Sequence, residues 1–326
     1  HRGADNFLNR EWDKMLDWLN SDDPLAQNIG YLVISGDIVD GVGVYPNQEK
    51  ELDITDLYEQ YEITGKDLER VPDHMETIIL PGNHDAVRLA EPQPVLSSEV
   101  QSHFNHGHFV GNPCRFKIGG SDVLSYHGKS IDDMVMNLNE ASYEHPENAM
   151  KQMLKRRHLA PQWGVKNQIA SEPTDMLTID STPDIFVTGH THGHCMQKYQ
   201  DIQLIVSSTW QGQTSFQKMV GFEPKPAIVS IVKLDDGSAA NTEHRLYLHR
   251  FEGKYKKDCG HINLVKKDYV GPKKSNRKAD DIEYCLDGEG EVVFLVNVDS
   301  ELLSITKKGK TSEVVKASNR KNILDT

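Results

Sequence analysis

The stretch YLVISGDIVD (residues 31–40) joins an apolar run to a glycine and two carboxylates. The run is short and rich in β-branched residues, so it predicts a buried strand that feeds a polar loop. Three further segments repeat this arrangement and carry candidate metal ligands after the apolar run. They are TIILPGNHD (77–85), VLSYHG (123–128) and IFVTGHTH (185–192). Because open α/β sheets place their sites at the carboxyl ends of strands, we expect the four loops to converge.

The residue types in these loops are those that hold a pair of divalent metal ions. Asp37 is the candidate bridge, Asn83 offers an amide oxygen, and His127, His190 and His192 offer imidazole nitrogens. Two such ions, about 3.5–4 Å apart, can hold a phosphodiester while one of them activates a water. Side chains two residues apart on an extended segment point to opposite faces, so either a local turn brings both final histidines to the metals or each serves a different ion. The mixed oxygen and nitrogen set admits manganese, iron or zinc.

His84 directly follows Asn83, and Asp85 stands behind it. This pairing resembles an imidazole held by a carboxylate, which can protonate a leaving oxygen or stabilise the transition state. Asp40, in the first loop, is either an acceptor behind the ligands or a turn former. These roles identify His84 and Asp85 as the candidate catalytic pair.

Other polar clusters have simpler explanations. Asp132 and Asp133 follow His127 and could lie behind the ligands, but acidic residues in the first turn of a helix explain them as well. A denser histidine cluster is formed by His103, His106 and His108. It follows no buried strand, so we expect a surface loop there.

Candidate substrate contacts lie farther along the chain. The basic run Lys155, Arg156 and Arg157 either binds DNA phosphates or is the cationic end of a helix, which the helix dipole favours. Trp210 follows the predicted strand 202–206 and either stacks on a splayed base or belongs to the core.

The composition indicates a soluble protein with enough material for a sizeable core. The chain has 326 residues, 37% hydrophobic content and a formal net charge of -13, which argues against simple coating of nucleic acid. No apolar run approaches the length of a membrane span. The four cysteines, Cys114, Cys195, Cys259 and Cys285, are far apart. They predict reduced thiols and a cytoplasmic location rather than a disulfide framework or a structural zinc site.

The hydrophobic periodicity predicts the main elements. We expect helices over 5–20 with Asp5 as the N-cap, near 54–61, over 131–138 and over 146–158, and strands over 227–234 and 245–251. A phosphoesterase domain should span 1–253. Residues 254–326 should form a basic linker and a β-rich tail around 291–298. Nine basic and two acidic residues between 254 and 278 either contact phosphates or form a solvated linker.

The order of the motifs resembles the calcineurin-like metallophosphoesterase superfamily and, at finer grain, the small-subunit family of archaeal family-D DNA polymerases. The strings that carry the resemblance are SGDIVDG (35–41), YPNQ (45–48), LPGNHDAVR (80–88), FVGNP (109–113), YHGKS (126–130), MLKRRHLAP (153–161) and TWQ (209–211). His1-Arg2-Gly3 resembles the end of an Asp-x-His metal motif. We therefore expect an aspartate upstream of the printed sequence and a trimmed or fragmentary chain.

The resemblance implies an α/β (α+β) fold in which two mixed β-sheets are sandwiched between helices, with a small C-terminal appendage. The implied ligands are His1, Asp37 and His192 for one metal and Asp37, Asn83, His127 and His190 for the other. His84 would be the transition-state histidine and Arg88 a substrate contact. The implied activity is a 3′-5′ exonuclease on single-stranded DNA ends that proofreads for a large polymerase subunit. Independently of the resemblance, the hard oxygen donors of Asp37 and Asn83 favour manganese as the metal. The sliding clamp is a further implied partner.

Two other functions stay open from the sequence. One is a stand-alone phosphoesterase that acts on a small phosphate ester or a cyclic nucleotide. The other is a non-catalytic scaffold for the polymerase subunit, which the retention of six candidate ligand and catalytic residues after the strands argues against. Activity on single-stranded DNA compared with activity on small esters separates these functions.

Overall fold

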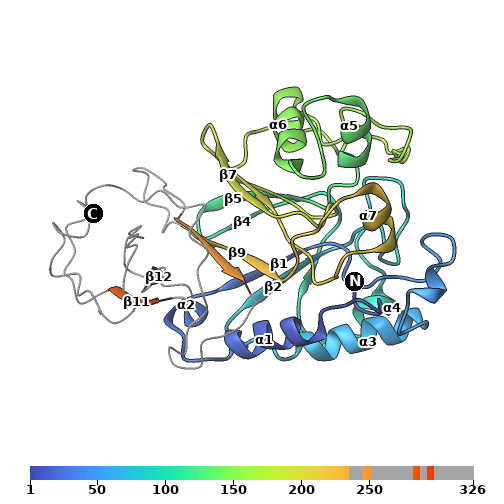
Figure 1. Ribbon diagram of the computed structural model, residues 1–326. Coiled ribbons are helices and arrows are strands. Elements are labelled where there is room, and N and C mark those ends of the chain that lie inside the picture. The colour runs from blue at the N-terminus through green and yellow to red at the C-terminus, as the bar shows by residue number, and fades with distance from the viewer. Residues whose placement is uncertain (235–244, 251–281, 287–291, 297–326) are drawn as a thin grey trace.

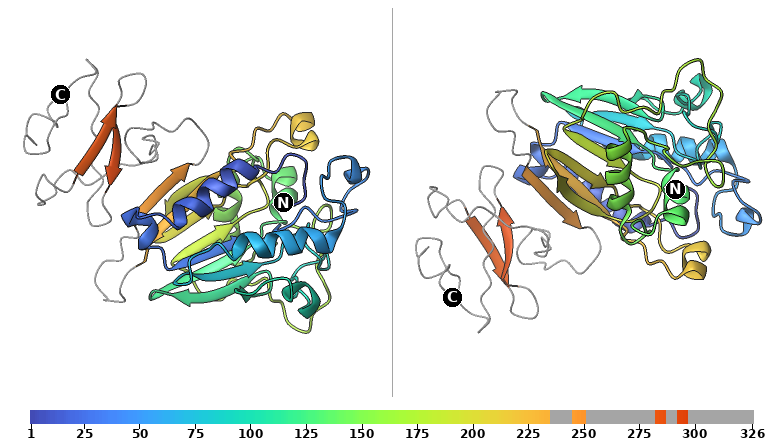
Figure 2. Two further views of the ribbon diagram at one scale, coloured as in Figure 1. Left: turned by 90° about the horizontal axis from the view of Figure 1, so that it is seen from below. Right: turned by 90° about the horizontal axis from the view of Figure 1, so that it is seen from above.

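The computed structural model describes residues 1–234, 245–250, 282–286 and 292–296. Two β-sheets lie at the centre, and helices cover the outer face of each sheet (Figure 1). Seen from below, α1 (Asn9–Leu19) and α3 (Leu57–Leu68) cross the first sheet; seen from above, α6 (Pro146–Arg156) crosses the second (Figure 2). The expected sandwich of two sheets between helices is confirmed.

The first sheet is parallel and carries two of the predicted loops. Its order is β1 (Tyr31–Ser35), β2 (Glu76–Leu80) and β3 (His108–Phe109). Ser35 pairs with Leu80, so β1 and β2 end at the same level. The loops that follow them therefore begin side by side.

The second sheet has a parallel centre with an antiparallel strand at each edge. Its order is β4 (Cys114–Ile118), β5 (Ser121–Tyr126), β6 (Ile185–Thr188), β8 (Ile202–Val206) and β7 (Cys195–Tyr199). Tyr126 pairs with Thr188, so β5 and β6 also end together. All four predicted metal loops therefore follow parallel strands.

Two antiparallel hairpins complete the described strands. β9 (Ile228–Lys233) pairs with β10 (Arg245–Arg250), which confirms both strands expected there. β11 (Ile282–Leu286) pairs with β12 (Val292–Val296). β12 lies inside the β-rich patch that was expected around 291–298. The predicted domain boundary at residue 253 and the basic linker lie outside the described residues.

The shorter helices connect the strands. They are α2 (Pro24–Gln27), the 3-10 helix η1 (Gln48–Lys50), α4 (Ser98–Gln101), α5 (Ile131–Asn137) and α7 (Ser215–Val220). None of the helices in the described part of the chain combines the length and the apolar character needed to cross a membrane.

Strand residues of the second sheet pack alternately on its two faces. Phe186 and Leu204 face α5 and α6, whereas Ile185 and Ile205 belong to a smaller cluster on the opposite face. Burial on both faces explains why these strands have unbroken apolar runs. A largely apolar cavity of about 690 Å³ lies between β1, β6, β8 and β9 and reaches the imidazole of His127.

The predicted helices have the right places, but the first one starts later than expected. α1 begins at Asn9 after Leu8, so Asp5 is not its N-cap. Residues 2–7 instead form turns, and isolated bridges join Arg2 to Val39 and Phe7 to Gln211. Pairing with the site loops thus overrides the helical pattern.

The histidine cluster at 103–108 also differs in part from the expectation. His103 and His106 lie in the loop after α4, but His108 begins β3 and contacts Glu76 at 2.7 Å. This contact lies at the surface, and neither His108 nor Glu76 belongs to a group of candidate metal ligands among the described residues.

Leu204→Ala should lower the free energy of unfolding by about 2–5 kcal/mol, because its side chain is 0% exposed and the neighbouring residues cannot fully close the cavity. Leu89→Ala is the matched control: Leu89 is 60% exposed, and its loss should change stability by no more than about 0.5 kcal/mol. Urea denaturation measures both. Equal effects would place Leu204 outside the core.

Candidate metal centre

The candidate ligands meet where the carboxyl ends of the parallel strands in the two sheets come together. The loops after β1, β2, β5 and β6 carry Asp37, Asn83 with His84, His127, and His190 with His192. His127 Nδ1 donates to the carbonyl oxygen of Ser35 at 2.8 Å and so joins the end of β5 to the end of β1. The predicted convergence of the four loops is present in the structure.

Asp37 lies at the centre of this convergence. Its Oδ2 is 3.5 Å from His1 Nε2 and 3.2 Å from His127 Nε2. Its Oδ1 accepts the backbone N–H of His84 at 2.8 Å. Asp37 belongs both to the group His1–Asp37–His84 and to the group Asp37–His127–His190, each with ligand atoms within 4.8 Å of one another. One carboxylate is thus shared by two sets of imidazoles, as a bridging ligand requires.

Four of the imidazoles have their outer nitrogen held by an acceptor. These contacts are His1 Nδ1 to Asp40 Oδ1 (3.0 Å), His84 Nδ1 to the Asp40 carbonyl (2.8 Å), His127 Nδ1 to the Ser35 carbonyl (2.8 Å) and His190 Nε2 to Asp132 Oδ2 (3.0 Å). In the neutral ring, an acceptor at the outer nitrogen places the proton there and leaves the inner lone pair free. This is the usual way in which proteins prepare histidine for a metal.

His192 is held differently. Its Nδ1 accepts from Gln217 Nε2 at 3.0 Å, and its Nε2 lies 2.8 Å from His1 Nε2. The amide donor leaves the proton of the neutral ring on Nε2, so ligation by this nitrogen requires Gln217 to turn its oxygen toward the ring. The structure therefore groups His84, rather than His192, with His1 and Asp37.

Backbone strain accompanies the ligands. Asp37, His190 and His192 have φ values of 53°, 63° and 57°, in the left-handed region that non-glycine residues rarely adopt. Such conformations cost about 1–3 kcal/mol each and cluster at functional sites. The left-handed turn at His190 and His192 brings both imidazoles toward the site. This is the local turn that the sequence offered as one of two ways to place these histidines.

Two glycines permit the close approach of the loops. A Cβ on Gly82 would collide with Asp37 Oδ1, and a Cβ on Gly36 would collide with His127 Nδ1. Gly36 also has a φ of 95°, which disfavours any side chain. These two positions thus explain why each of these two ligand motifs begins with glycine.

The charges of the site complement one another. Burial opposes ionisation of Asp37, but the charge of His127 and its hydrogen bond hold the pKa of Asp37 well below its usual value. Burial would also lower the pKa of His127, but Asp37 raises it to about 9. Burial lowers the pKa of His84 and of His190 and keeps them neutral. Because metal ligation requires neutral imidazoles, a cation in this position displaces the proton on His127.

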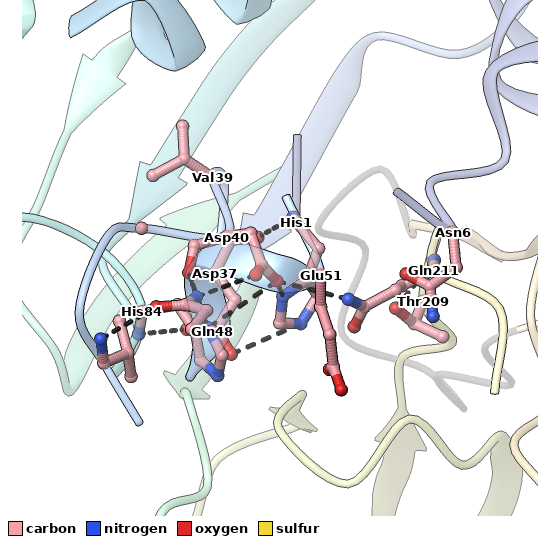
Figure 3. A network of polar contacts seen from close by, with 12 residues as sticks. His1, Asn6, Asp37, Val39, Asp40, Gln48, Glu51, His84, Thr209 and Gln211 are labelled. Atoms are coloured by element: carbon pink, nitrogen blue, oxygen red, sulfur yellow. Dashed lines mark hydrogen bonds and ion pairs between the residues drawn. The ribbon is translucent and has the colours of Figure 1, made fainter. Parts of the chain in front are cut away.

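Asp40 is a buried acceptor rather than a turn former alone. Besides His1, it accepts Gln48 Nε2 at 2.8 Å and Gln211 Nε2 at 3.2 Å, as Figure 3 shows. These contacts fix both carboxylate oxygens. Asp40 therefore orients His1 through a rigid network.

The expected pairing of His84 with Asp85 is wrong. Asp85 accepts the backbone N–H groups of Gly82 at 2.8 Å and Ile38 at 3.3 Å and the hydroxyl of Tyr61 at 3.3 Å. Its carboxylate therefore joins the first two metal loops, and burial raises its pKa to about 6. The group behind His84 is the main-chain carbonyl of Asp40, because the residue after His84 turns back toward β1.

Of the two alternatives for Asp132, the structure supports the place behind the ligands. It contacts His190 and also accepts Lys129 Nζ at 2.6 Å and Tyr143 OH at 2.9 Å. His190 and Lys129 outweigh burial and lower the pKa of the Asp132 carboxyl. The sequence left this role open, because acidic residues in the first turn of α5 explained Asp132 equally well, although Ser130 makes no side-chain cap there. Its neighbour Asp133 instead accepts two backbone N–H groups of the 166–167 segment.

The proposed substrate contacts are engaged elsewhere. Arg88 pairs with Glu172 at 2.5 Å, and Arg157 donates to the carbonyls of Ile179 and Asp180. Arg156 contacts Gln152 on its own helix, and Lys155 is exposed at the end of α6. Trp210 packs edge-on against Trp12 with ring centroids 5.2 Å apart. The structure thus brings none of the five into the imidazole cluster.

The residues that are present fit two divalent metal ions. His1, Asp37 and His84 could hold one, and Asp37, His127 and His190 could hold the other. Asn83 Oδ1 lies 3.1 Å from His127 Nε2 and adds a hard oxygen donor to the second group. Mixed carboxylate, amide and imidazole donors suit manganese, iron and zinc.

Asp132→Asn should weaken binding of Mn²⁺ by the second group about ten- to a hundredfold, because the carboxylate orients His190 and increases its basicity. Asp122→Asn is the control, since Asp122 is likewise ion-paired, with Arg115 Nη2 at 2.6 Å, but lies at the other end of β5. Calorimetric titration measures both. Unchanged affinity in Asp132→Asn would limit this carboxylate to a structural role.

Comparison with known proteins gives consistent relatives. The chain is 43% identical over 240 residues to the DNA polymerase II small subunit of Archaeoglobus fulgidus, and the alignment covers 72% of this chain and 49% of that one. It is 45% identical over 242 residues to the protein of the same name from Methanocaldococcus jannaschii, covering 72% and 41%. The chain thus spans about half or less of the length of the curated relatives it matches.

Similarity to solved structures is weaker. A structure described as a novel archaeal phosphodiesterase has 14% identity and a TM-score of 0.34, covering 73% of this chain and 92% of that one. Wild-type Vps29 of Entamoeba histolytica complexed with Zn²⁺ has 13% identity and a TM-score of 0.35, covering 77% and 93%. The family model of the DNA polymerase alpha/epsilon B-subunit matches residues 4–196. Because this match spans more than half of the sequence, the chain belongs to the DNA polymerase alpha/epsilon B-subunit family.

Proposed function

We propose that this chain is the phosphoesterase part of the small subunit of an archaeal family-D DNA polymerase. In this proposal it removes nucleotides from single-stranded 3′ ends of DNA with two divalent metal ions, Mn²⁺ being the favoured metal. The observation that carries the proposal is the carboxylate of Asp37, shared between two imidazole groups. The names of the curated relatives support the choice of a polymerase subunit.

The metals, when bound, supply an activated water and neutralise the charge that develops on the phosphate. The residues of the chain prepare the site for them. Asp37 joins the two groups, and Asp40 and Asp132 orient the imidazoles of His1 and His190. Because these contacts are already made, no reorganisation of the ligands is needed when substrate arrives.

His84 has two roles that its geometry permits. Its Nδ1 donates to the carbonyl of Asp40, so its Nε2 is directed into the site. As an imidazolium, with a second proton on Nε2, it would give that proton to the leaving oxygen and return to the neutral form that burial favours; the Asp40 carboxylate at 3.7 Å would stabilise the charged ring before the transfer. Unprotonated, it would complete the group of His1 and Asp37. We propose the first role for catalysis.

The proposal includes the partners of a replicative small subunit. They are a large catalytic subunit, the 3′ end of DNA and the sliding clamp, in an archaeal cytoplasm. Removal of a mispaired 3′ nucleotide would place this activity in proofreading. The functional unit would then be the heterodimer with the large subunit.

The full-length protein should shorten a 5′-labelled single-stranded oligonucleotide stepwise from its 3′ end in Mn²⁺. Bis(p-nitrophenyl) phosphate, a small diester, is the comparison substrate. Hydrolysis of the small ester with intact DNA would favour a stand-alone phosphoesterase. Two bound metals without hydrolysis of either substrate would favour a non-catalytic scaffold.

Asp37→Ala should abolish the nuclease activity, because it removes the donor shared by both groups and leaves neighbouring imidazoles without their counter-charge. Asp53→Ala, at an exposed carboxylate, is the control and should keep full activity. Metal content and DNA hydrolysis are measured together. Full activity in Asp37→Ala would overturn the two-metal assignment.

His84→Ala should lower turnover by roughly a hundredfold or more while both metals stay bound, since a positioned acid acts on the reaction and not on metal affinity. Turnover per bound metal is the deciding quantity. If the variant loses one metal and keeps its turnover per fully occupied site, His84 is a ligand of the His1 group instead.

A further inference from the structure

Behind Asn83 and His127 lies a buried polar network that the mechanism does not use. It consists of Glu91, Gln93 and Asn112, whose exposed fractions are 0%, 4% and 0%. Asn112 Oδ1 accepts the backbone N–H of His127 at 2.8 Å. Its Nδ2 donates to Gln93 Oε1 at 2.7 Å and more weakly to Glu91 Oε1 at 3.4 Å. Both ends of the Asn112 amide are thus fixed.

The network continues from Gln93 to the second ligand loop. Gln93 Nε2 donates to the carbonyl of Gly82, the residue before Asn83, at 3.1 Å. The backbones of Gln93 and Asn112 also exchange two hydrogen bonds, of 2.7 and 2.9 Å. Two adjoining side-chain amides therefore connect the backbone of one candidate ligand to the backbone just before another.

Glu91 supports the same arrangement from behind. Its Oε2 accepts Tyr126 OH and Asn167 Nδ2, each at 2.7 Å. Tyr126 directly precedes His127 and accepts the backbone N–H of Ser130 at 3.1 Å. A fully buried carboxylate with these partners costs free energy to place, and it holds the residues around it in one arrangement.

We propose that Asn112 is a positioning residue that sets the separation of Asn83 and His127, and with it the metal affinity of the Asp37–His127–His190 group. Asn83 Oδ1 and His127 Nε2 are 3.1 Å apart, and the chain of amides connects their two loops. Asn112 itself is not among the candidate ligands. The inference rests on the two-metal centre of the proposed function. It names a residue that controls how tightly the Asp37–His127–His190 group binds its metal.

The effect should be selective because the network holds the backbone of His127 directly, whereas no described hydrogen bond joins it to His1 or His84. His1 and His84 are held by Asp40, which makes no contact with Glu91, Gln93 or Asn112 among the described hydrogen bonds. A change at Asn112 should therefore weaken one metal and spare the other. A purely structural residue would affect both metals in step with stability.

Asn112→Asp keeps the shape and the acceptor for His127 but replaces the donor to Gln93 with a second acceptor. The Mn²⁺ binding step that is lost in His127→Ala should weaken about ten- to a hundredfold, while the other step stays unchanged. Calorimetric titration resolves the two steps, and urea denaturation reports the stability of each variant.

Gln93→Met provides a second test if Asn112→Asp does not fold. It removes the contact with Gly82 at similar volume and should weaken the same step. Gln203→Met is the matched control, because Gln203 is also a buried amide (3% exposed) but lies on β8. It should leave both steps unchanged.

The outcomes separate this inference from the proposed function. Selective weakening of one step supports the positioning role even if the wild-type protein does not cut DNA, which would overturn only the nuclease proposal. Equal weakening of both steps, no weakening, or fewer than two steps in the wild-type protein would overturn the positioning role.

Discussion

The buried carboxylate of Asp37 is the constraint on which the rest of the centre depends. A carboxylate removed from water costs several kcal/mol unless charged or polar partners replace its hydration. Here the partners come from both sheets, because His127 follows β5 while Asp37 itself follows β1. The bond from His127 to the Ser35 carbonyl joins the same two strand ends. The contacts that compensate the charge of Asp37 therefore also hold the ends of β1 and β5, and with them the two sheets, together at this edge.

The side chains that hold the imidazoles from behind come from several different elements of the fold. Asp132 comes from α5, Gln217 from α7 and Asp40 from the loop after β1, and each holds a different imidazole. Ligands in left-handed backbone conformations persist only where surrounding contacts over-determine them. His190 and His192 meet this condition, since each has such a contact on its outer nitrogen. A centre held in this way is prepared before any ligand arrives.

These costs bear on what a member of this polymerase family does with the site. A chain that only held a partner would gain stability from replacing buried carboxylates such as Asp37 and Asp132 with apolar residues of similar volume. It would also have no use for left-handed His190. The presence of these groups and of the glycine at position 82, which leaves room for Asp37, agrees with the catalytic role proposed above.

The sequence by itself determined the layered α/β class and the convergence of the four loops, because short unbroken apolar runs are typical of buried parallel strands, and open α/β sheets place their sites at the carboxyl ends of such strands. Only the tertiary structure decided which polar residues stand behind the ligands. Asp85 turned out to join two loops, Asp132 to orient His190, and Trp210 to pack against the core. The physical reason is that strand and helix periodicity is local, whereas these contacts join residues as far apart in the chain as Asp132 and His190 and depend on how the sheets and helices pack.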